Sequence, residues 1–320
     1  MIDFCVLGSG VAGSTIANLL SKKYSIHVFD KARGPGGRSS NKRFRNNLSF
    51  DHGVQYISPK SKEFTKLIQK LYKKKIFKTW GGNHLDFTFE NKPLVSKYIG
   101  QKANNALSKY NLKGIKLSFA SQIKKIDYKK KFWEILLNDN SKYQFKGLIL
   151  TCPFPQLKKL ARKYLDKKVS KLKVQMQPNI TAMVVFKNQK ELPISSIKFD
   201  DDILSWAANE NSKKRFKSNF NLWTLQASLK WSKKTINKYK TDKKILDQLI
   251  TRFIKLTGLK KNKIVHKKIH GWKYSYNYKQ TSLLSSWNKK YQLGICGDWF
   301  DGPKVENAWL SAIDIAKKIK

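Results

Sequence analysis

The hydrophobic pattern of the chain opens with two short apolar runs on either side of a glycine-rich turn. The first run, residues 4–7, leads into Gly8, Gly10 and Gly13, and a segment with helical spacing of its apolar residues follows. The second run, residues 26–29, ends in Asp30. This order predicts a strand, a tight turn, a helix and a second strand that carries an acidic residue at its tip.

The remaining pattern predicts an α/β chain in two parts. Helical spacing predicts helices over residues 61–76, 97–110, 156–164, 241–256 and 305–319. Apolar or alternating runs predict strands over residues 115–119, 123–126, 132–137, 143–145, 147–153, 180–186, 203–207, 222–227, 266–278 and 292–298. We therefore predict a dinucleotide-binding domain of residues 1–57, 100–157 and 288–320. Residues 58–99 and 158–287 form a second domain with a mixed or antiparallel sheet and helices.

The glycine spacing G-x-G-x-x-G has a physical reading at each position. Gly8 permits the tight turn, Gly10 lets the backbone approach a pyrophosphate, and Gly13 lets helix and strand pack closely. The helix start offers free N–H groups and the positive end of its dipole to phosphates. Asp30 is placed to accept hydrogen bonds from ribose hydroxyls. The alternative is a glycine-rich turn in some other α/β protein.

A second glycine-rich loop follows Asp30 and is also cationic. Gly36 and Gly37 exclude helix or strand interior, and the loop and the residues after it carry Lys31, Arg33, Arg38, Arg43 and Arg45. Such a loop suits a second contact with a long anionic cofactor. Simple NAD dehydrogenases of the Rossmann type do not need it.

Charge and composition change this picture only slightly. The 320 residues include 66 Lys and Arg against 21 Asp and Glu, which gives a net charge of +45. Nearly all of the positive charge is Lys, spread in short pieces, whereas specific readers of nucleic acid rely on Arg. We therefore predict a solvated basic surface rather than a nucleic-acid interface, although binding to nucleic acid or an acidic surface stays open. The positive field favours anionic small substrates.

Neither the apolar runs nor the cysteines point to a membrane, a metal or an extracellular protein. No run of about 18 apolar residues exists. The first strand begins at residue 2, which leaves no room for a signal peptide. Cys5, Cys152 and Cys296 each lie in or beside an apolar run and are expected to be buried thiols in a reducing compartment. We predict a cytoplasmic protein with no membrane partner and no metal site.

Taken in order, these motifs resemble the flavin-dependent amine-oxidase superfamily. The resemblance rests on Gly8-x-Gly10-x-x-Gly13, Asp30-Lys31, Gly36-Gly37-Arg38, Asp51-x-Gly53-x-Gln55-Tyr56, and Gly297-Asp298 before a terminal helix. Trp231-Ser232, Trp272-Lys-Tyr274 and Val305-Glu306-x-Ala308-Trp309 are most similar to renalase and its bacterial relatives. The likeness covers essentially the whole chain. It departs at Gln101-Lys102-Ala103, where those relatives tend to have a Pro-Gly-Met-like turn.

The resemblance implies a split Rossmann-type FAD-binding domain of the amine-oxidase and glutathione-reductase kind, plus a substrate domain. Non-covalent FAD is the implied cofactor. The first turn would hold the pyrophosphate, Asp30 the adenosine ribose, Asp298 a ribityl hydroxyl, and the last helix would aim its N–H groups at the flavin pyrimidine. The implied cofactor-binding residues are Gly8, Gly10, Ala12, Gly13, Asp30, Lys31, Gly37, Arg38, Val54, Gln55, Ile123, Asp298, Val305 and Glu306.

The implied reaction is oxidation of a dihydronicotinamide, a misformed NAD(P)H isomer, by hydride transfer to flavin N5, with O2 giving H2O2. No catalytic residue is assigned, because this transfer needs only a positioned donor. Candidates that line the site are His52, Trp272, Tyr274 and Trp299, each of which could instead be structural. Arg43, Arg45 and Lys97 are candidate contacts of a dinucleotide substrate. An amine oxidase or desaturase-type flavoenzyme, and a basic flavin-fold binding protein without turnover, are the alternatives.

Overall fold

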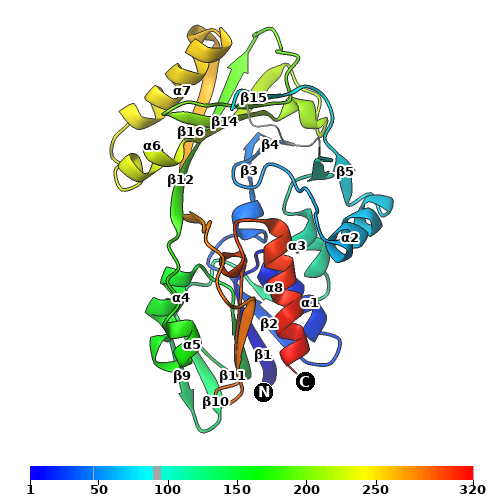
Figure 1. Cartoon of the computed structure of the whole chain (residues 1–320), viewed down its shortest axis with the longest axis vertical. Coiled ribbons are helices and arrows are strands. Elements are labelled where there is room, and N and C mark those ends of the chain that lie inside the picture. The colour runs from blue at the N-terminus through cyan, green and yellow to red at the C-terminus, as the bar shows by residue number, and fades with distance from the viewer. Residues whose placement is uncertain (46, 89–94, 320) are drawn as a thin grey trace.

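The computed structural model describes residues 1–45, 47–88 and 95–319. Two bodies, each built around one sheet, are stacked along the long axis of the molecule (Figure 1). The described N-terminal end and the last helix lie at the same end of that axis, in the body that contains the first strand. The first body therefore uses both ends of the chain.

The first body is built on a mostly parallel sheet, which has eight strands among the described residues. In spatial order its main strands are β17 (Ser285–Asn288), β18 (Leu293–Cys296), β11 (Lys142–Leu150), β1 (Ile2–Leu7), β2 (Ile26–Phe29) and β8 (Lys116–Ser118). The hairpin of β9 (Ile123–Lys129) and β10 (Phe132–Leu137) extends β11 in antiparallel fashion. β1 lies between β2 and β11 and is parallel to both.

Helices cover both faces of this first sheet. The helices α1 (Val11–Leu20) and α8 (Val305–Lys318) pack on one face, where Ile16 and Ala312 are buried in a common core with Val6 of β1. On the other face α4 (Phe154–Ala161) and α5 (Lys167–Ser170) pack over the strands and the β9–β10 hairpin. The apolar runs of β1 and β2 are continuous because both of their faces are buried, as expected for parallel strands.

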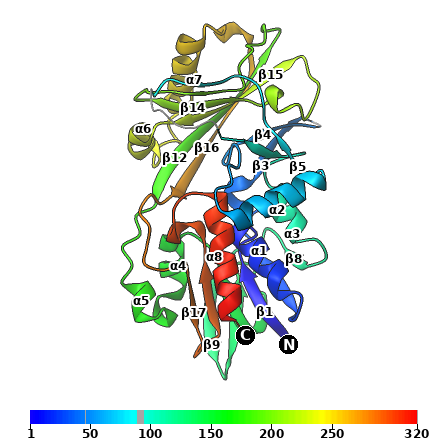
Figure 2. The same ribbon diagram turned by 45° about the vertical axis from the view of Figure 1, so that its right-hand side comes forward.

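The second body is a sheet that is antiparallel apart from one pair of strands. Its order is β16 (Ile264–Tyr276), β12 (Gln177–Lys187), β15 (Phe220–Ala227), β14 (Leu204–Asn209), β13 (Ser196–Lys198) and β6 (His84–Asp86), and only β13 and β6 are parallel. The helices α6 (Leu229–Thr235) and α7 (Lys244–Thr257) cover one face, where Val184 and Trp223 are buried (Figure 2). The alternate residues Met183 and Leu222 face the opposite side, toward Phe50.

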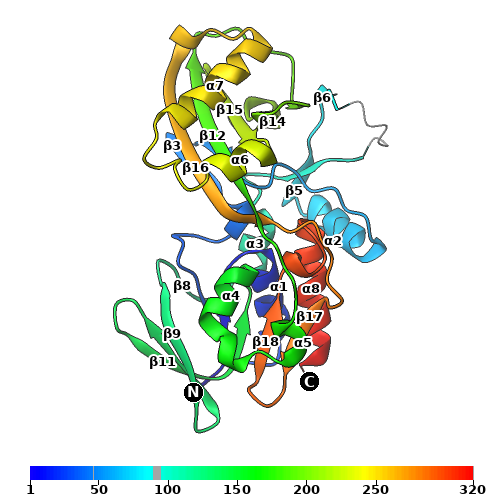
Figure 3. The same ribbon diagram turned by 60° about the vertical axis from the view of Figure 1, so that its left-hand side comes forward.

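Short elements connect the two bodies. They are the hairpin of β3 (Asn41–Arg45) and β4 (Leu48–Asp51), the helices α2 (Lys62–Lys73) and α3 (Ala106–Asn111), and the pair β5 (Phe77–Thr79) and β7 (Tyr98–Gly100). Phe64 of α2 and Leu107 of α3 are buried in the same core as α1. The long strand β16 runs from the second body toward the first (Figure 3).

The predicted helix over 97–110 is wrong in its first half, where the chain forms β7. Gly100 explains the difference, because a Cβ there would lie 1.9 Å from the carbonyl oxygen of Ala103. The Gly100 N–H donates to Asn104 Oδ1 (3.1 Å), which closes a turn before α3. The predicted strands 143–145 and 147–153 form one strand, β11. β17 pairs with β18, so the C-terminal part of the first sheet begins at Ser285, a few residues before the predicted domain boundary at residue 288.

Close packing of α1 on β1 leads to a test of Gly13. A Cβ at Gly13 would lie 1.9 Å from the carbonyl oxygen of Gly8, so the helix start would have to move away from the strand. We expect Gly13→Ala to lower the free energy of unfolding by about 1–3 kcal/mol or more, measured by urea denaturation. Gly34→Ala is the control, because no described atom lies within 4 Å of its Cβ position. Equal stabilities of the two variants would contradict this account.

Candidate functional site

The start of α1 forms a cradle with the loop at Gly36 and Gly37. Gly10 is the N-cap of α1 and no side chain of the described residues caps it, so the first N–H groups of the helix stay available. The Gly36 N–H donates to Ser9 O (3.0 Å). A Cβ at Gly37 would lie 3.2 Å from Gly10 Cα, so two backbones approach closely at this point. This is the geometry that a pyrophosphate on a helix N-terminus requires.

Asp30 stands at the end of β2, where the sequence predicts it. Its Oδ2 accepts from the N–H (2.7 Å) and the hydroxyl (2.5 Å) of Ser9, and its Oδ1 accepts from the Ala32 N–H (2.8 Å). Oδ1 accepts only one hydrogen bond and therefore still has acceptor capacity for a hydroxyl, whereas Oδ2 already accepts two. The Ser121 N–H donates to Asp30 O (2.9 Å), which brings the segment before Ile123 to the same end of the sheet. Lys31 is exposed.

Arg38 and Asp298 form an ion pair across almost the whole sequence. The Arg38 guanidinium donates through Nη2 to Oδ1 (2.5 Å) and through Nη1 to Oδ2 (2.8 Å) of Asp298. Nη1 also donates to Ser275 O (2.6 Å) in β16. The resemblance implied a ribityl hydroxyl as the partner of Asp298; in this structure each carboxylate oxygen accepts one hydrogen bond from Arg38 and can accept one more. The pair joins the cationic loop, the end of β18 and the second body.

The segment 51–56 passes beneath the second sheet and is held there by its backbone. Gln226 Nε2 donates to Gly53 O (2.7 Å) and Trp272 Nε1 donates to His52 O (2.9 Å). The Val54 N–H donates to Arg38 O (3.0 Å). Asn104 Nδ2 donates to the carbonyls of Val54 and Gln55, both at 2.8 Å. The segment is therefore fixed from β15, β16 and the loop before α3.

A buried charge cluster, made of Asp51, Glu210, Lys213 and Arg215, anchors the start of this segment. The Lys213 side chain is fully buried, and its Nζ lies 2.9 Å from Asp51 Oδ2 and 2.9 Å from Glu210 Oε2. Arg215 Nη1 also donates to Asp51 Oδ2. The two acids and two bases cancel in charge. Sequence reasoning does not predict this cluster, because Asp51 lies about 160 positions before Glu210, Lys213 and Arg215, and those three residues belong to no motif.

The cluster shifts the pKa values of both of its acids, and it also binds the side chain of Gln55, a predicted cofactor-binding residue. Burial opposes ionisation of Asp51, but the charges of Lys213 and Arg215 outweigh it and hold its pKa below the usual value. Burial raises the pKa of Glu210 in spite of Lys213. The Gln55 side chain turns into the cluster, donating to the carbonyls of Asp51 and Gly53 (3.1 Å for the latter) and accepting from Lys213 (3.4 Å). The Gln55 amide is therefore structural here.

His52 belongs to an aromatic group at the β16 side of the segment. Its ring centroid lies 4.9 Å from that of His270 and 5.0 Å from that of Trp272. Burial, together with the nearby His270, lowers the pKa of His52 to about 3. Its Nδ1 is buried and has no hydrogen-bond partner among the described residues. His52 is thus a neutral, buried imidazole at neutral pH.

Several other predicted residues lie elsewhere than expected. Trp299 is 1% exposed, is stacked on Phe300 and donates to Cys152 O (3.2 Å), so its assignment to the substrate face was wrong. The Glu306 carboxylate accepts from the N–H groups of Lys60 (2.9 Å) and Ser61 (2.7 Å), which ties α8 to the start of α2. Its side chain is therefore not directed at a cofactor. Tyr274 is half-buried, and Arg43 and Arg45 are exposed on β3.

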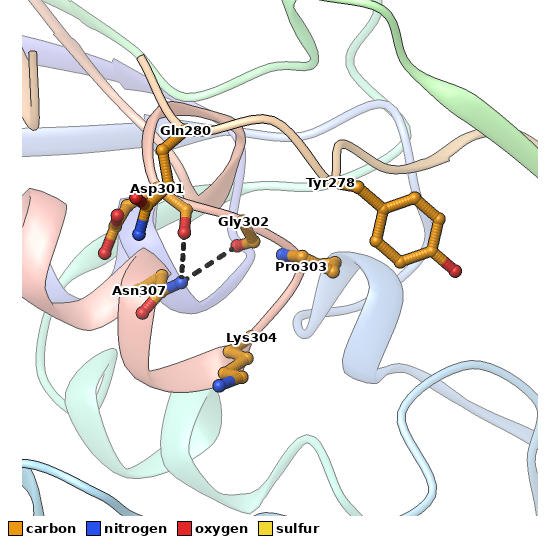
Figure 4. Close-up of a pocket in the computed structure, with 7 residues that line it drawn as sticks. All are labelled: Tyr278, Gln280, Asp301, Gly302, Pro303, Lys304 and Asn307. Atoms are coloured by element: carbon orange, nitrogen blue, oxygen red, sulfur yellow. Dashed lines mark hydrogen bonds between the residues drawn. The ribbon is translucent and has the colours of Figure 1, made fainter. Parts of the chain in front are cut away.

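A polar pocket of about 410 Å³ opens at the start of α8. Figure 4 shows its lining residues, which are Tyr278, Gln280, Asp301, Gly302, Pro303, Lys304 and Asn307. Asn307 Nδ2 donates to the carbonyls of Asp301 (2.7 Å) and Gly302 (3.3 Å), which shapes the loop before the helix. Val305 is the first residue of α8, and no described side chain caps the helix. The N–H groups at this end remain available to an acceptor.

No group of three His, Cys, Asp or Glu side chains in the described part of the chain could hold a metal ion. No helix formed by residues 1–45, 47–88 and 95–319 is long and apolar enough to span a membrane.

Comparison with known proteins first defines the class of the N-terminal segment. Residues 6–71 match the family model described as NAD(P)-binding Rossmann-like domain. This range contains the glycine turn, Asp30 and the Gly36–Arg38 loop, which are the parts that form the cradle.

Comparison of structures then places the whole chain. It shares its fold with a "Putative protoporphyrinogen oxidase" from Exiguobacterium sp. 255-15, with a TM-score of 0.76, 9% identity, and coverage of 99% of this chain and 98% of that chain. It also shares its fold with a triple mutant of putrescine oxidase, made in a redesign of its cofactor binding. That match has a TM-score of 0.74 and 10% identity, and it covers 99% of this chain and 98% of that chain. The predicted fold class, α/β with a Rossmann-type domain and a second part built on a largely antiparallel sheet with helices, is confirmed. The narrower likeness to renalase stays a prediction.

Removing Lys213 tests the energetic role of the buried charge cluster. We expect Lys213→Met to lower the free energy of unfolding by about 3–5 kcal/mol, because it leaves buried acids without their partner. The double variant Lys213→Met/Glu210→Gln restores charge balance and should recover much of this loss in urea denaturation. Lys230→Met is the control, since its ion pair with Asp202 is exposed. A loss for Lys213→Met as small as that of the control would contradict the proposed role.

The buried state of His52 predicts a pH dependence of stability. Its pKa falls from 6.5 to about 3 on folding, so between these values the unfolded chain binds the extra proton. Stability should therefore fall as the pH drops from about 6.5, by up to about 1.4 kcal/mol per pH unit for this group. His52→Gln should show a shallower fall in urea denaturation between pH 7 and pH 4.5. Identical slopes for the two proteins would show that His52 titrates normally.

Proposed function

We propose that this protein is an FAD-dependent oxidoreductase of the renalase type. The observation that carries the proposal is the convergence of three segments distant in sequence: the turn at Gly10, the loop with Gly37 and Arg38, and the end of β18 with Asp298. A mononucleotide would need only the first of these. The starts of α1 and α8 both lack a side-chain cap among the described residues, and their free N–H groups suit the anionic parts of a long cofactor.

The residues present fit this cofactor. The Gly10–Gly37 approach leaves a cradle that a Cβ would fill, and Asp30 retains acceptor capacity toward a ribose. Asn105, which faces the Gly36 turn, has a buried Oδ1 without a partner among the described residues. Gly8, Gly10, Ala12, Gly13, Gly37 and Arg38 would hold the pyrophosphate and its linker, Asp30 with the backbone of Ile123 the adenosine, and Val54, Gln55 and Val305 the flavin through their backbones.

When bound, FAD supplies a hydride acceptor at N5 and, with O2, a route for two electrons to H2O2. The overall reaction is balanced: dihydronicotinamide, O2 and a proton give the nicotinamide cation and H2O2. The protein contributes position. The buried charge cluster and Gln226 hold the segment 51–56 in place. Trp272 packs on His52 of this segment, and both side chains are uncharged.

Charge favours a nicotinamide nucleotide over an amine as the substrate. The fold match to putrescine oxidase makes amine oxidation the second candidate. A diamine is a dication, however, and the net charge of +45 repels it, whereas it attracts the phosphates of a nucleotide. Lys97, half-buried beside Tyr56 at 5.5 Å from its ring centroid, adds a local cation to the segment 51–56. No nucleic-acid partner is proposed.

The proposal predicts a yellow protein whose flavin is bleached by dihydronicotinamides. We expect the purified chain to carry FAD that acid precipitation releases, because no covalent link is proposed. Under anaerobic conditions, isomers of NAD(P)H reduced at the wrong ring carbon should bleach the flavin within seconds, and admission of O2 should restore its colour with one H2O2 per substrate. Bleaching is followed by stopped-flow absorbance.

The controls separate the alternatives. Putrescine and benzylamine, tested in the same way, should leave the flavin oxidised; bleaching by an amine alone would favour the second candidate. A flavin that neither class bleaches would point to a binding protein without turnover. A colourless protein that takes up no added FAD would overturn the whole proposal.

A further inference from the structure

An aromatic group on the other side of the segment 51–56 contains an indole N–H without a partner. Trp206 of β14 lies 5.9 Å from Tyr56, ring centroid to ring centroid, with the planes tilted by 38°. Tyr56 in turn lies 6.3 Å from Trp80. Trp206 Nε1 is buried and has no hydrogen-bond partner among the described residues. We call Tyr56, Trp80, Trp206 and Lys97 the Trp206 group.

The unpaired indole stands out against other tryptophans of the same chain. The indole N–H groups of Trp80, Trp133 and Trp272 donate to Ser212 Oγ (3.0 Å), Tyr291 O (2.7 Å) and His52 O (2.9 Å). A buried donor without an acceptor costs about 1–3 kcal/mol, so such groups are rare and call for an explanation. A bound ligand that brings an acceptor oxygen would remove this cost.

The Trp206 group is continuous with the proposed flavin site. Trp206 pairs across strands with Gln226, whose side chain donates to Gly53 O (2.7 Å). Tyr56 directly follows Gln55 in the segment 51–56. A ligand bound beside Trp206 and Tyr56 would therefore lie next to the segment 51–56, under the second sheet.

A cation completes the group. Lys97 Nζ lies 5.5 Å from the centroid of the Tyr56 ring, and burial lowers the pKa of Lys97 below its usual value. A partly buried ammonium next to an aromatic ring suits an anionic group attached to a flat ring. The group thus offers flat aromatic surfaces, an indole N–H without a partner among the described residues, and an ammonium group.

We propose that the Trp206 group binds the nicotinamide nucleotide, with Trp206 Nε1 donating to the carboxamide oxygen, Tyr56 packing on the ring and Lys97 attracting the phosphate. This inference rests on the proposed function and names the residues that would select its substrate. The oxidised flavin also has carbonyl oxygens that could accept from Trp206, so the test separates substrate from cofactor.

The test uses the flavin-loaded full chain and two ligands. Nicotinamide mononucleotide and pyridine mononucleotide, which lacks the carboxamide, are titrated against wild type and Trp206→Phe, with binding read from the flavin absorbance. We expect Trp206→Phe to weaken nicotinamide mononucleotide about tenfold and to change pyridine mononucleotide by less than about twofold, because only the former loses a hydrogen bond. Flavin content and affinity should stay at the wild-type level.

A second variant keeps the inference testable if Trp206→Phe does not fold. Lys97→Gln should weaken nicotinamide mononucleotide about tenfold and leave nicotinamide riboside, which has no phosphate, unchanged. Equal affinities of wild type and both variants would overturn the inference while leaving the proposed function intact. Loss of flavin from Trp206→Phe would also overturn it, because the indole would then serve the cofactor. Failure of wild type to bind or oxidise any dihydronicotinamide would instead defeat the proposed function itself.

Discussion

The placement of Lys213 between Asp51 and Glu210 is the constraint on which the candidate site depends. The three side chains are fully buried, and each needs the others to avoid an unpaired charge in a low-dielectric interior. Glu210 and Lys213 come from the loop after β14 in the second body, whereas Asp51 ends β4 beside the first. These ion pairs therefore tie the end of β4 to the second body. That approach brings Gln226 and Trp272 onto the segment 51–56.

A second ionic contact closes the other side of the site. Arg38 lies 260 positions before Asp298, yet the two side chains form a paired contact that also reaches the backbone of β16. The bonds of Arg38 to Asp298 and to Ser275 O hold the cationic loop against the end of β18 and against β16. The large positive charge of the chain lies largely outside these pairs, so it acts on the approach of substrates rather than on the fold.

Local patterns were sufficient for the elements that a dinucleotide site needs. The β1–α1–β2 unit, the turn at Gly8 and Gly10, and the position of Asp30 all follow from periodicity and glycine spacing, because these depend on residues within one turn or strand. Prediction from the sequence failed where contacts with residues distant in sequence decided the local structure. Residues 98–100 have helical neighbours in sequence but pair with β5, and Trp299 resembles a surface aromatic in its motif but is buried among Phe154 and Phe300.

The sequence by itself determined the class of fold and the glycine-rich turn at the start of α1, because strand burial, turn formation and helix packing are encoded in short ranges of residues. Only the tertiary structure decided which polar groups are already paired. Asp298 and Glu306 are engaged by Arg38 and by the start of α2, Gln55 is turned into the buried charge cluster, and Trp206 is left with a free donor among the described residues. Hydrogen-bond partners are set by chain packing in three dimensions, and spacing along the sequence carries no record of them.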